Sequence, residues 1–165
     1  MGKPIIIHPI GTVRNTITSQ SKTAGLTTES RIIIKEGYST ALKGLRGYSH
    51  LIILYWLHEA SENSAELLAK PGNRPYLPLI GIFATRNTTH RPNRLELSIV
   101  KLLGVRSNIV RVVGLDAFNG SPVIDIKPFM RWDITSERIE RRIHGRSMES
   151  KFTSKIRVPE WWRRF

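Results

Sequence analysis

Residues 81–98, GIFATRNTTHRPNRLELS, hold the densest set of side chains that could do chemistry. An apolar stretch runs there into a polar loop that carries Arg86, Arg91 and Arg94. A guanidinium is a planar fork that can grip a carboxylate or a phosphate through two parallel hydrogen bonds. The loop therefore has the composition of an anion-binding site, and equally that of a solvated loop in a basic protein.

The net charge of the chain points to a phosphate-bearing partner. Its 165 residues include 26 Lys and Arg against 13 Asp and Glu, which gives a formal charge of +13 and a pI near 10.8. Such a field attracts polymeric phosphate or a phosphorylated ligand. An anionic membrane is a weaker candidate, because the basic residues are not gathered on one amphipathic helix.

Several classes of catalytic and metal site have no support in the sequence. With 0 Cys, the chain has no thiolate nucleophile, disulfide framework or zinc ribbon, and its 5 His lack the spacing of metal ligands. The glycine-rich motifs that bind dinucleotides or nucleotide phosphates do not occur, nor does a nucleophile elbow. We therefore expect no metal and no classical hydrolase chemistry.

The apolar runs and the first residues indicate a cytoplasmic protein that does not enter a membrane. The longest apolar run, 51–57, is far shorter than the ~20 residues of a spanning helix. The opening MGKPIIIHPIG lacks the hydrophobic core and cleavage site of a signal peptide. The absence of cysteine agrees with an intracellular location.

The elements that would position these residues are mostly strands. Segments rich in Ile, Val and aromatic residues alternate with Gly, Pro and Asn, a pattern typical of short strands and turns. The expected strands are 5–14, 31–35, 48–58, 79–85, 97–105, 108–115 and 122–126. Many strands within one domain's length predict a mainly β fold, a small closed or partly open β-barrel with a few short helices.

Turn and helix signals add local detail to this barrel. Asn119-Gly120 predicts a hairpin that joins strands 108–115 and 122–126, because both residues tolerate positive φ. The periodicity of apolar residues and a capping-type start predict short helices. They are expected at 41–46, 61–69 and 136–144.

The composition changes near residues 131–135, after which the chain is polar and basic. We therefore expect a β-barrel domain over 1–132 and a basic C-terminal extension over 133–165. The extension ends in PEWWRRF, where aromatic residues and arginines are interleaved. That ending can stack on RNA bases, and it can equally anchor a core or a dimer.

Three blocks of residues follow one another along the chain. They are LRGYSHL at 45–51 with Leu57-His58, GIFATR at 81–86 with RPN at 91–93 and Leu97-Ser98, and GLDAFNGSPVIDIKPF at 114–129. Together with Ile10-Gly11 they resemble the TrmO-type (YaeB-like, TsaA-like domain) family. That family's blocks read roughly LxxFSHL…FH, GVFATRSPxRPNPIGLS and LDxxDGTPVLDIKPY. The resemblance spans residues 6–129, most of the chain.

The resemblance implies a β-barrel methyltransferase that depends on S-adenosylmethionine and works as a homodimer. In that family the substrate is tRNA, and the methyl group goes to the exocyclic nitrogen of N-threonylcarbamoylated adenosine beside the anticodon. Carried over by position, the cofactor-binding residues are Leu57, His58, Arg86, Leu97, Gly114, Leu115 and Asp116.

The chemistry of this set suits the cofactor in part. Arg86 can pair with the cofactor's carboxylate, and Asp116 can accept hydrogen bonds from its ribose hydroxyls or its ammonium. Apolar backbone around Leu97 and Leu115 can flank the adenine. The methyl group is already activated by its sulfonium, so catalysis needs chiefly an in-line nucleophile roughly 3–3.5 Å away. His58 and Asp116 are the catalytic candidates, as acceptors of the amino proton.

Basic residues of the loop and of the extension are the candidates for RNA contact. Residues 138–165 hold nine basic side chains against three acidic ones, which suits a strand of phosphates. The expected RNA-binding residues are Arg91, Arg94, Arg141, Arg142, Arg146, Arg163 and Arg164.

Simpler structural roles are also open for residues within the matching blocks. Asp125 and Lys127 can form a local ion pair at a strand end, which contributes little. His50, after Ser49, can cap a turn. Tyr55-Trp56 lies in an apolar run, where a core position is more common than a stacking platform.

The chain departs from the family pattern where the cofactor and substrate would bind. Arg-Leu-Glu stands at 94–96 in place of Pro-Ile-Gly, and four residues instead of three separate Arg86 from Arg91. Losing that Gly removes a place for close backbone approach. Two alternatives therefore stay open: a non-catalytic relative that binds RNA or a ligand, and a methyltransferase with a small-molecule acceptor.

Overall fold

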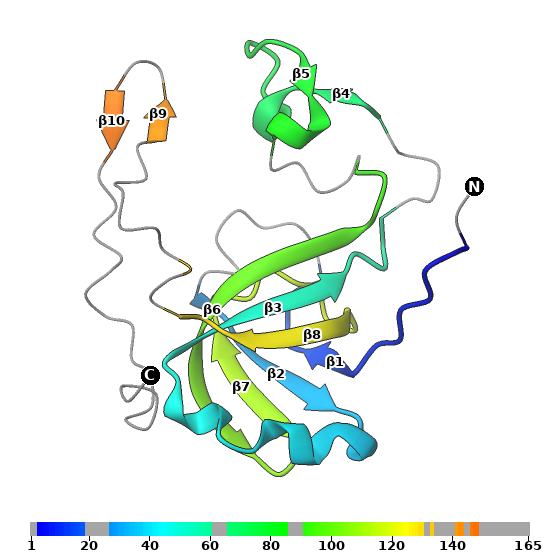
Figure 1. The fold of residues 1–165 in the computed structure, drawn as a ribbon. Coiled ribbons are helices and arrows are strands. Elements are labelled where there is room, and N and C mark those ends of the chain that lie inside the picture. The colour runs from blue at the N-terminus through cyan, green and yellow to red at the C-terminus, as the bar shows by residue number, and fades with distance from the viewer. Residues whose placement is uncertain are drawn as a thin grey trace.

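Six antiparallel strands close into a barrel in the order β1-β2-β7-β6-β3-β8 (Figure 1). The computed structural model describes residues 3–18, 27–60, 66–85, 91–130, 133, 141–143 and 146–148. The barrel strands are β1 (Gly11–Arg14), β2 (Glu29–Ile34), β3 (His50–Trp56), β6 (Leu95–Arg106), β7 (Ile109–Val113) and β8 (Pro122–Pro128). Pairing between β1 and β8 closes the wall, which confirms the expected mainly β barrel.

Shorter elements join or flank the barrel strands. Four 3-10 helices are described: η1 (Glu36–Leu42), η2 (Leu45–Gly47), η3 (Pro71–Asn73) and η4 (Ile82–Ala84). Two small hairpins pair β4 (Leu68–Ala69) with β5 (Ile80–Gly81), and β9 (Arg141–Ile143) with β10 (Arg146–Met148). Residues 66–85, which we call the arm, stand away from the barrel in Figure 1. No helix in the described ranges is long and apolar enough to cross a membrane.

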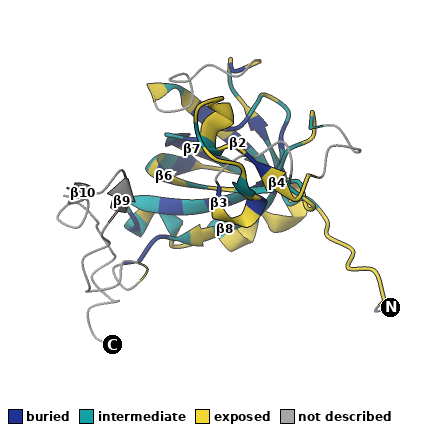
Figure 2. Cartoon of the chain, turned by 90° about the horizontal axis from the view of Figure 1, so that it is seen from above, coloured by how far each residue is buried: buried dark blue, intermediate teal, exposed yellow. Residues whose placement is uncertain are grey.

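The core fills the barrel because strand side chains alternate between its two faces. Along β3, the side chains of Leu51, Ile53 and Tyr55 are buried while those between them are only half-buried. Figure 2 shows this alternation of buried and intermediate residues along β3. The buried side chains of β3 share the core with valines and isoleucines of the other barrel strands, among them Val13, Ile32, Val100, Val110, Val112 and Val123.

The expected hairpin between 108–115 and 122–126 is wrong. Gly120 does turn the chain, with a φ of 90°, but β7 pairs with β2 and β6, while β8 pairs with β1 and β3. The loop between them bonds to the start of the chain instead, since the Gly120 N–H donates to the Val13 carbonyl. A turn signal shows where the chain reverses, and barrel closure decides which strands become neighbours.

Two of the expected helices are wrong where the structure describes them. Segment 61–69 contains strand β4, and segment 136–144 contains strand β9; their remaining residues lie outside the described residues apart from 66 and 67. A short run of residues can fit the apolar periodicity of a helix or that of a strand. Pairing with a neighbouring strand then overrides local helix propensity. The helix expected at 41–46 is replaced by parts of η1 and η2.

Four strands are shorter than expected, two of them by five residues or more, and the domain boundary remains a prediction. The first begins at Gly11 instead of residue 5, and segment 79–85 pairs only at Ile80–Gly81 before it turns into η4. Residues 131, 132 and 134–140 lie outside the described residues, so the division into 1–132 and 133–165 stays an expectation.

Gly11 lies where two barrel strands come too close for a side chain. A Cβ at this position would lie 2.5 Å from the Ile33 carbonyl oxygen. We expect Gly11→Ala to lower the free energy of unfolding by about 1–3 kcal/mol through overpacking. Gly104→Ala, on β6 with nothing within 4 Å of its Cβ, is the matched control and should be near neutral in urea denaturation. Equal midpoints for the two variants would contradict this.

The stability of the barrel should fall at mildly acidic pH through His50. Burial, and secondarily the charge of Lys101 directly across the sheet, holds the pKa of His50 below its ordinary 6.5. As pH falls past 6.5, the unfolded chain takes up this proton first, so stability is lost. We expect His50→Gln to lose less stability between about pH 7 and pH 5 in urea denaturation. An equally steep pH dependence in the variant would refute this role.

Candidate functional site

The hydroxyl of Tyr55 joins three segments near the end of β3. Its side chain is only 1% exposed. The hydroxyl donates a hydrogen bond of 2.6 Å to the Asp116 carbonyl and lies 3.3 Å from Ser98 Oγ on β6. The backbone at Asp116 is therefore held next to the first residues of β6, where Leu97 and Ser98 lie.

Asn15 holds the other side of the β7–β8 loop. Its Nδ2 donates to the Ala117 carbonyl and to the hydroxyl of buried Ser30, each at 2.9 Å. Asn119 Oδ1 in turn accepts from the Asn15 N–H at 3.3 Å. Asn15 was not among the residues predicted from the sequence, because an Asn after a strand is an ordinary turn residue and no motif marks it.

His58 lies against the same loop. Its Nδ1 is 3.3 Å from Ser121 Oγ, and its Nε2 is 3.6 Å from Glu59 Oε1. The imidazole keeps 30% of its side-chain exposure. A Cβ at Gly120 would lie 3.6 Å from Nε2, at a φ of +90° that disfavours side chains. Glycine at this turn therefore leaves the imidazole accessible.

The other described residues of the expected cofactor set differ in exposure and backbone conformation. The N–H of half-buried Leu57 donates to the Arg94 carbonyl at 2.8 Å, and Leu97 is 41% exposed. Gly114 takes a φ of 94°, the side chain of Leu115 is buried in the core, and Asp116 is exposed. Leu115 can thus offer a ligand only its backbone.

Arg86 lies outside the described residues, but its neighbour Arg91 is placed. Arg91 Nη1 donates to the carbonyls of Ile82 and Thr85, at 3.3 and 3.2 Å, and its guanidinium stacks over the Phe83 ring. Arg91 therefore holds together the described residues on the two sides of the segment that carries Arg86.

The other arginines proposed for RNA have different settings. Arg94 Nη1 donates to the Ala60 carbonyl at 2.9 Å, and its guanidinium lies 5.0 Å from the centre of the Trp56 ring. Arg141 and Arg142 lie on β9 and Arg146 on β10, whereas Arg163 and Arg164 lie outside the described residues. No motif indicated that Arg91 binds the arm, or that Arg94 joins Ala60 to Trp56 on β3.

The simpler structural roles considered above are visible for several residues. Lys127 Nζ lies 2.6 Å from Asp125 Oδ2, and this partner raises the pKa of Lys127. His50 Nδ1 lies 2.9 Å from Ser49 Oγ, and Tyr55 belongs to the core. Among the described residues, no group of three or more His, Cys, Asp or Glu could hold a metal ion.

Residues 7–133 match the sequence model of the tRNA-methyltransferase O N-terminal domain. The chain belongs to the TrmO family. This confirms the resemblance of its three blocks. A solved TrmO structure from Pseudomonas aeruginosa shares the fold with a TM-score of 0.64 at 26% identity, over 82% of this chain and 61% of that one.

Two relatives of this chain differ in how far they extend beyond it. A probable S-adenosyl-L-methionine-binding protein of Methanothermobacter thermautotrophicus is 41% identical over 129 residues, 76% of this chain and 90% of the relative. The tRNA (adenine(37)-N6)-methyltransferase of Escherichia coli is 35% identical over 106 residues, 62% of this chain and 45% of the relative. The chain thus matches less than half of the Escherichia coli enzyme.

Removing the Tyr55 hydroxyl should loosen the site. We expect Tyr55→Phe to cost about 1–3 kcal/mol of unfolding free energy, because the Asp116 carbonyl loses its partner. Tyr48, also in the core, has no side-chain hydrogen bond within the described residues, so Tyr48→Phe is the control and should cost less. Hydrogen exchange of residues 114–121 should rise only in Tyr55→Phe. Similar exchange in both variants would argue against this anchoring role.

Proposed function

We propose that the protein is a methyltransferase that uses S-adenosylmethionine to methylate tRNA. The acceptor is the exocyclic nitrogen of threonylcarbamoyladenosine next to the anticodon. The observation that carries this proposal is the cluster around Tyr55, in which Asp116 of the third matching block meets Ser98 of the second block on β6. The names of the relatives, S-adenosyl-L-methionine-binding protein and tRNA (adenine(37)-N6)-methyltransferase, support the cofactor and the substrate.

The residues of the cluster fit the cofactor's chemistry. Asp116 offers an exposed carboxylate for ribose hydroxyls or an ammonium group, and Leu97 on β6 offers an exposed apolar surface for a nucleobase. Gly114 has no side chain to hinder approach to the backbone there. Arg86, on the segment that Arg91 closes, is the proposed partner of the cofactor's carboxylate.

The bound cofactor would supply an electrophilic methyl group, and a C–N bond to the acceptor forms as the C–S bond breaks. The chain's own task is to hold the acceptor in line and to remove its amino proton. His58 is the proposed proton acceptor. If Nδ1–H donates to Ser121, then Nε2 keeps the lone pair that takes the proton, and Glu59 nearby stabilises the resulting charge.

The partners complete the proposal. Arg91, Arg94, Arg141, Arg142, Arg146, Arg163 and Arg164 are proposed to contact the phosphates of tRNA. A homodimer in the cytoplasm follows from the family resemblance. Exposed Leu97 and Ile99, two residues apart on β6, support a second copy, because they form a small apolar patch that a partner could cover.

Asp116→Asn tests the cofactor site. We expect a loss of about 10- to 100-fold in affinity for S-adenosylmethionine by isothermal titration, since a charged hydrogen-bond acceptor is removed. Methyl transfer from labelled S-adenosylmethionine to tRNA should fall with it. Asp125→Asn is the matched control, because Asp125 is also a partly exposed carboxylate but pairs with Lys127 on β8, and it should bind as the wild type does.

The outcomes separate the open alternatives. Cofactor binding without any methyl transfer would favour a non-catalytic relative. Transfer to a small molecule but never to tRNA would favour a different acceptor. No saturable binding of the cofactor by the wild-type chain, or equal losses in Asp116→Asn and Asp125→Asn, would contradict the proposed site.

A further inference from the structure

Three arginines follow one another across neighbouring strands of the barrel. Arg14 on β1 lies directly opposite Arg31 on β2, and Arg31 lies directly opposite Arg111 on β7. All three are exposed. Side chains of directly opposed residues share one face of a sheet, and adjacent strands are about 4.8 Å apart. The three guanidiniums therefore stand side by side on the outer wall; we call them the arginine row.

This arrangement is electrostatically costly for an isolated barrel, because like charges directly opposite each other are destabilising. Only one carboxylate among the described residues offsets it. Glu29 binds Arg111 through two hydrogen bonds of 2.7 and 2.8 Å. That pair, and secondarily the charge of Arg31, lowers the pKa of Glu29. One carboxylate for three guanidiniums leaves a local charge of about +2.

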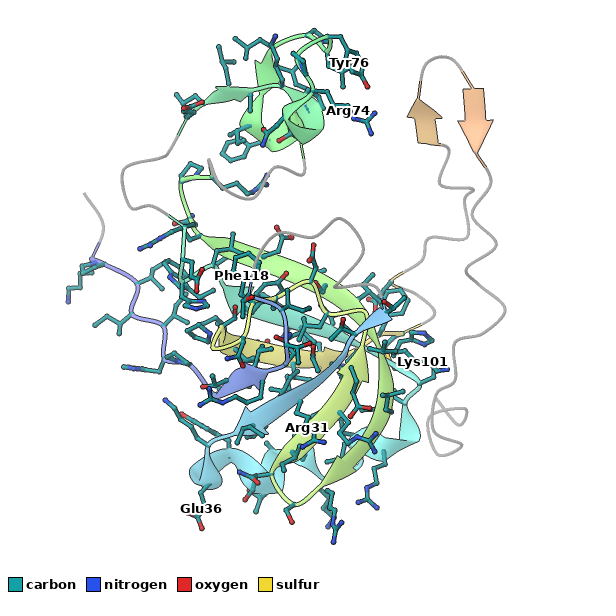
Figure 3. The ribbon with its side chains drawn as sticks, turned by 180° about the vertical axis from the view of Figure 1, so that it is seen from behind. Arg31, Glu36, Arg74, Tyr76, Lys101 and Phe118 are labelled. Atoms are coloured by element: carbon teal, nitrogen blue, oxygen red, sulfur yellow. The ribbon has the colours of Figure 1, made fainter. Side chains whose placement is uncertain are left out.

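The positive charge continues onto the next strand. On β6, Lys101 lies opposite Val113, and Arg106 lies opposite Ile109; both basic residues are exposed. Figure 3 labels Arg31 and Lys101 on the barrel, far from Arg74 on the arm. The wall formed by β1, β2, β7 and β6 therefore presents several cations in a band, which suits an extended polyanion better than a single small ion.

The arginine row adjoins the loop that carries the candidate site. Arg111 is three residues before Gly114. At the other end of the row, Arg14 precedes Asn15, whose side chain bonds to the Ala117 carbonyl of the loop. A strand of phosphates lying along the row would therefore pass next to the segment that contains Asp116.

We propose that the arginine row binds the phosphate backbone of the RNA substrate and positions it for the site; this rests on the proposed function. Arginine suits the role because its fork matches two phosphate oxygens and does not lose its charge. Contacts of this kind set register and affinity without reading the base sequence. The arginine row is separate from the loop arginines Arg91 and Arg94, whose guanidiniums contact the chain itself.

The test compares equal losses of charge at two places. Binding of unmodified tRNA to the full chain is measured by fluorescence anisotropy over a salt series, for Arg31→Gln and for Arg74→Gln on the arm. We expect Arg31→Gln to weaken binding several-fold and to reduce the slope of log affinity against log salt by about one. Arg74→Gln should keep the wild-type slope. Affinity for S-adenosylmethionine should be unchanged in both.

Glu29→Gln supplies a second, opposite readout. Removing this carboxylate frees Arg111 and removes a charge that repels phosphate, so tRNA should bind more tightly than to the wild type. If the Glu29–Arg111 pair serves only to stabilise the barrel, the urea midpoint alone will change. Unchanged tRNA affinity in Glu29→Gln together with an unchanged salt slope in Arg31→Gln would overturn the proposal.

The failure of this proposal is distinguishable from that of the proposed function. If the wild-type chain methylates tRNA but Arg31→Gln binds tRNA as tightly as the wild type does, only the role of the arginine row is overturned. Binding of tRNA that depends on Arg31, with no methyl transfer, would support the arginine row and overturn the proposed activity.

Discussion

The hydrogen bond from the buried Tyr55 hydroxyl to the Asp116 carbonyl is the contact on which the site depends. The loop after β7 leaves the barrel wall and returns as β8, with two strands between them, so β7 and β8 do not pair with each other. Backbone hydrogen bonds hold only the end of the loop, where Asn119 and Gly120 donate to Ile17 and Val13. Tyr55 and Asn15 fix it from two sides. The backbone of Asp116 is thereby kept beside β6, with its side chain exposed, while its neighbour Leu115 fills the core.

Cationic side chains in this protein divide into two kinds by what they touch. Arg91 and Arg94 donate to carbonyls and stack on aromatic rings, so they hold the loops around the site. Arg14 and Arg31 project from the outer wall of the barrel. The first kind shapes the place where chemistry is proposed, and the second provides a field for a polyanion.

The richness of residues 48–58 in isoleucine and aromatic side chains was enough to predict the strand β3, and Tyr55 within it was correctly predicted to be a core residue. The Asn119-Gly120 turn was also recognised, but its partner strands were assigned wrongly because a hairpin is only the most common outcome of such a turn. The helix predicted at 61–69 was wrong for a related reason. The apolar pair in that segment suits a helix or a strand, and pairing with β5 makes residues 68–69 a strand.

The sequence by itself determined the family, through three ordered blocks, and it determined which residue types are available to bind a cofactor. The tertiary structure decided which of them meet. Asp116 and Tyr55 are 61 positions apart, and Arg31 and Arg111 are 80 apart along the chain. Such neighbours arise only from strand register around a closed barrel, because a local pattern specifies which face a residue occupies but not which strand lies beside it.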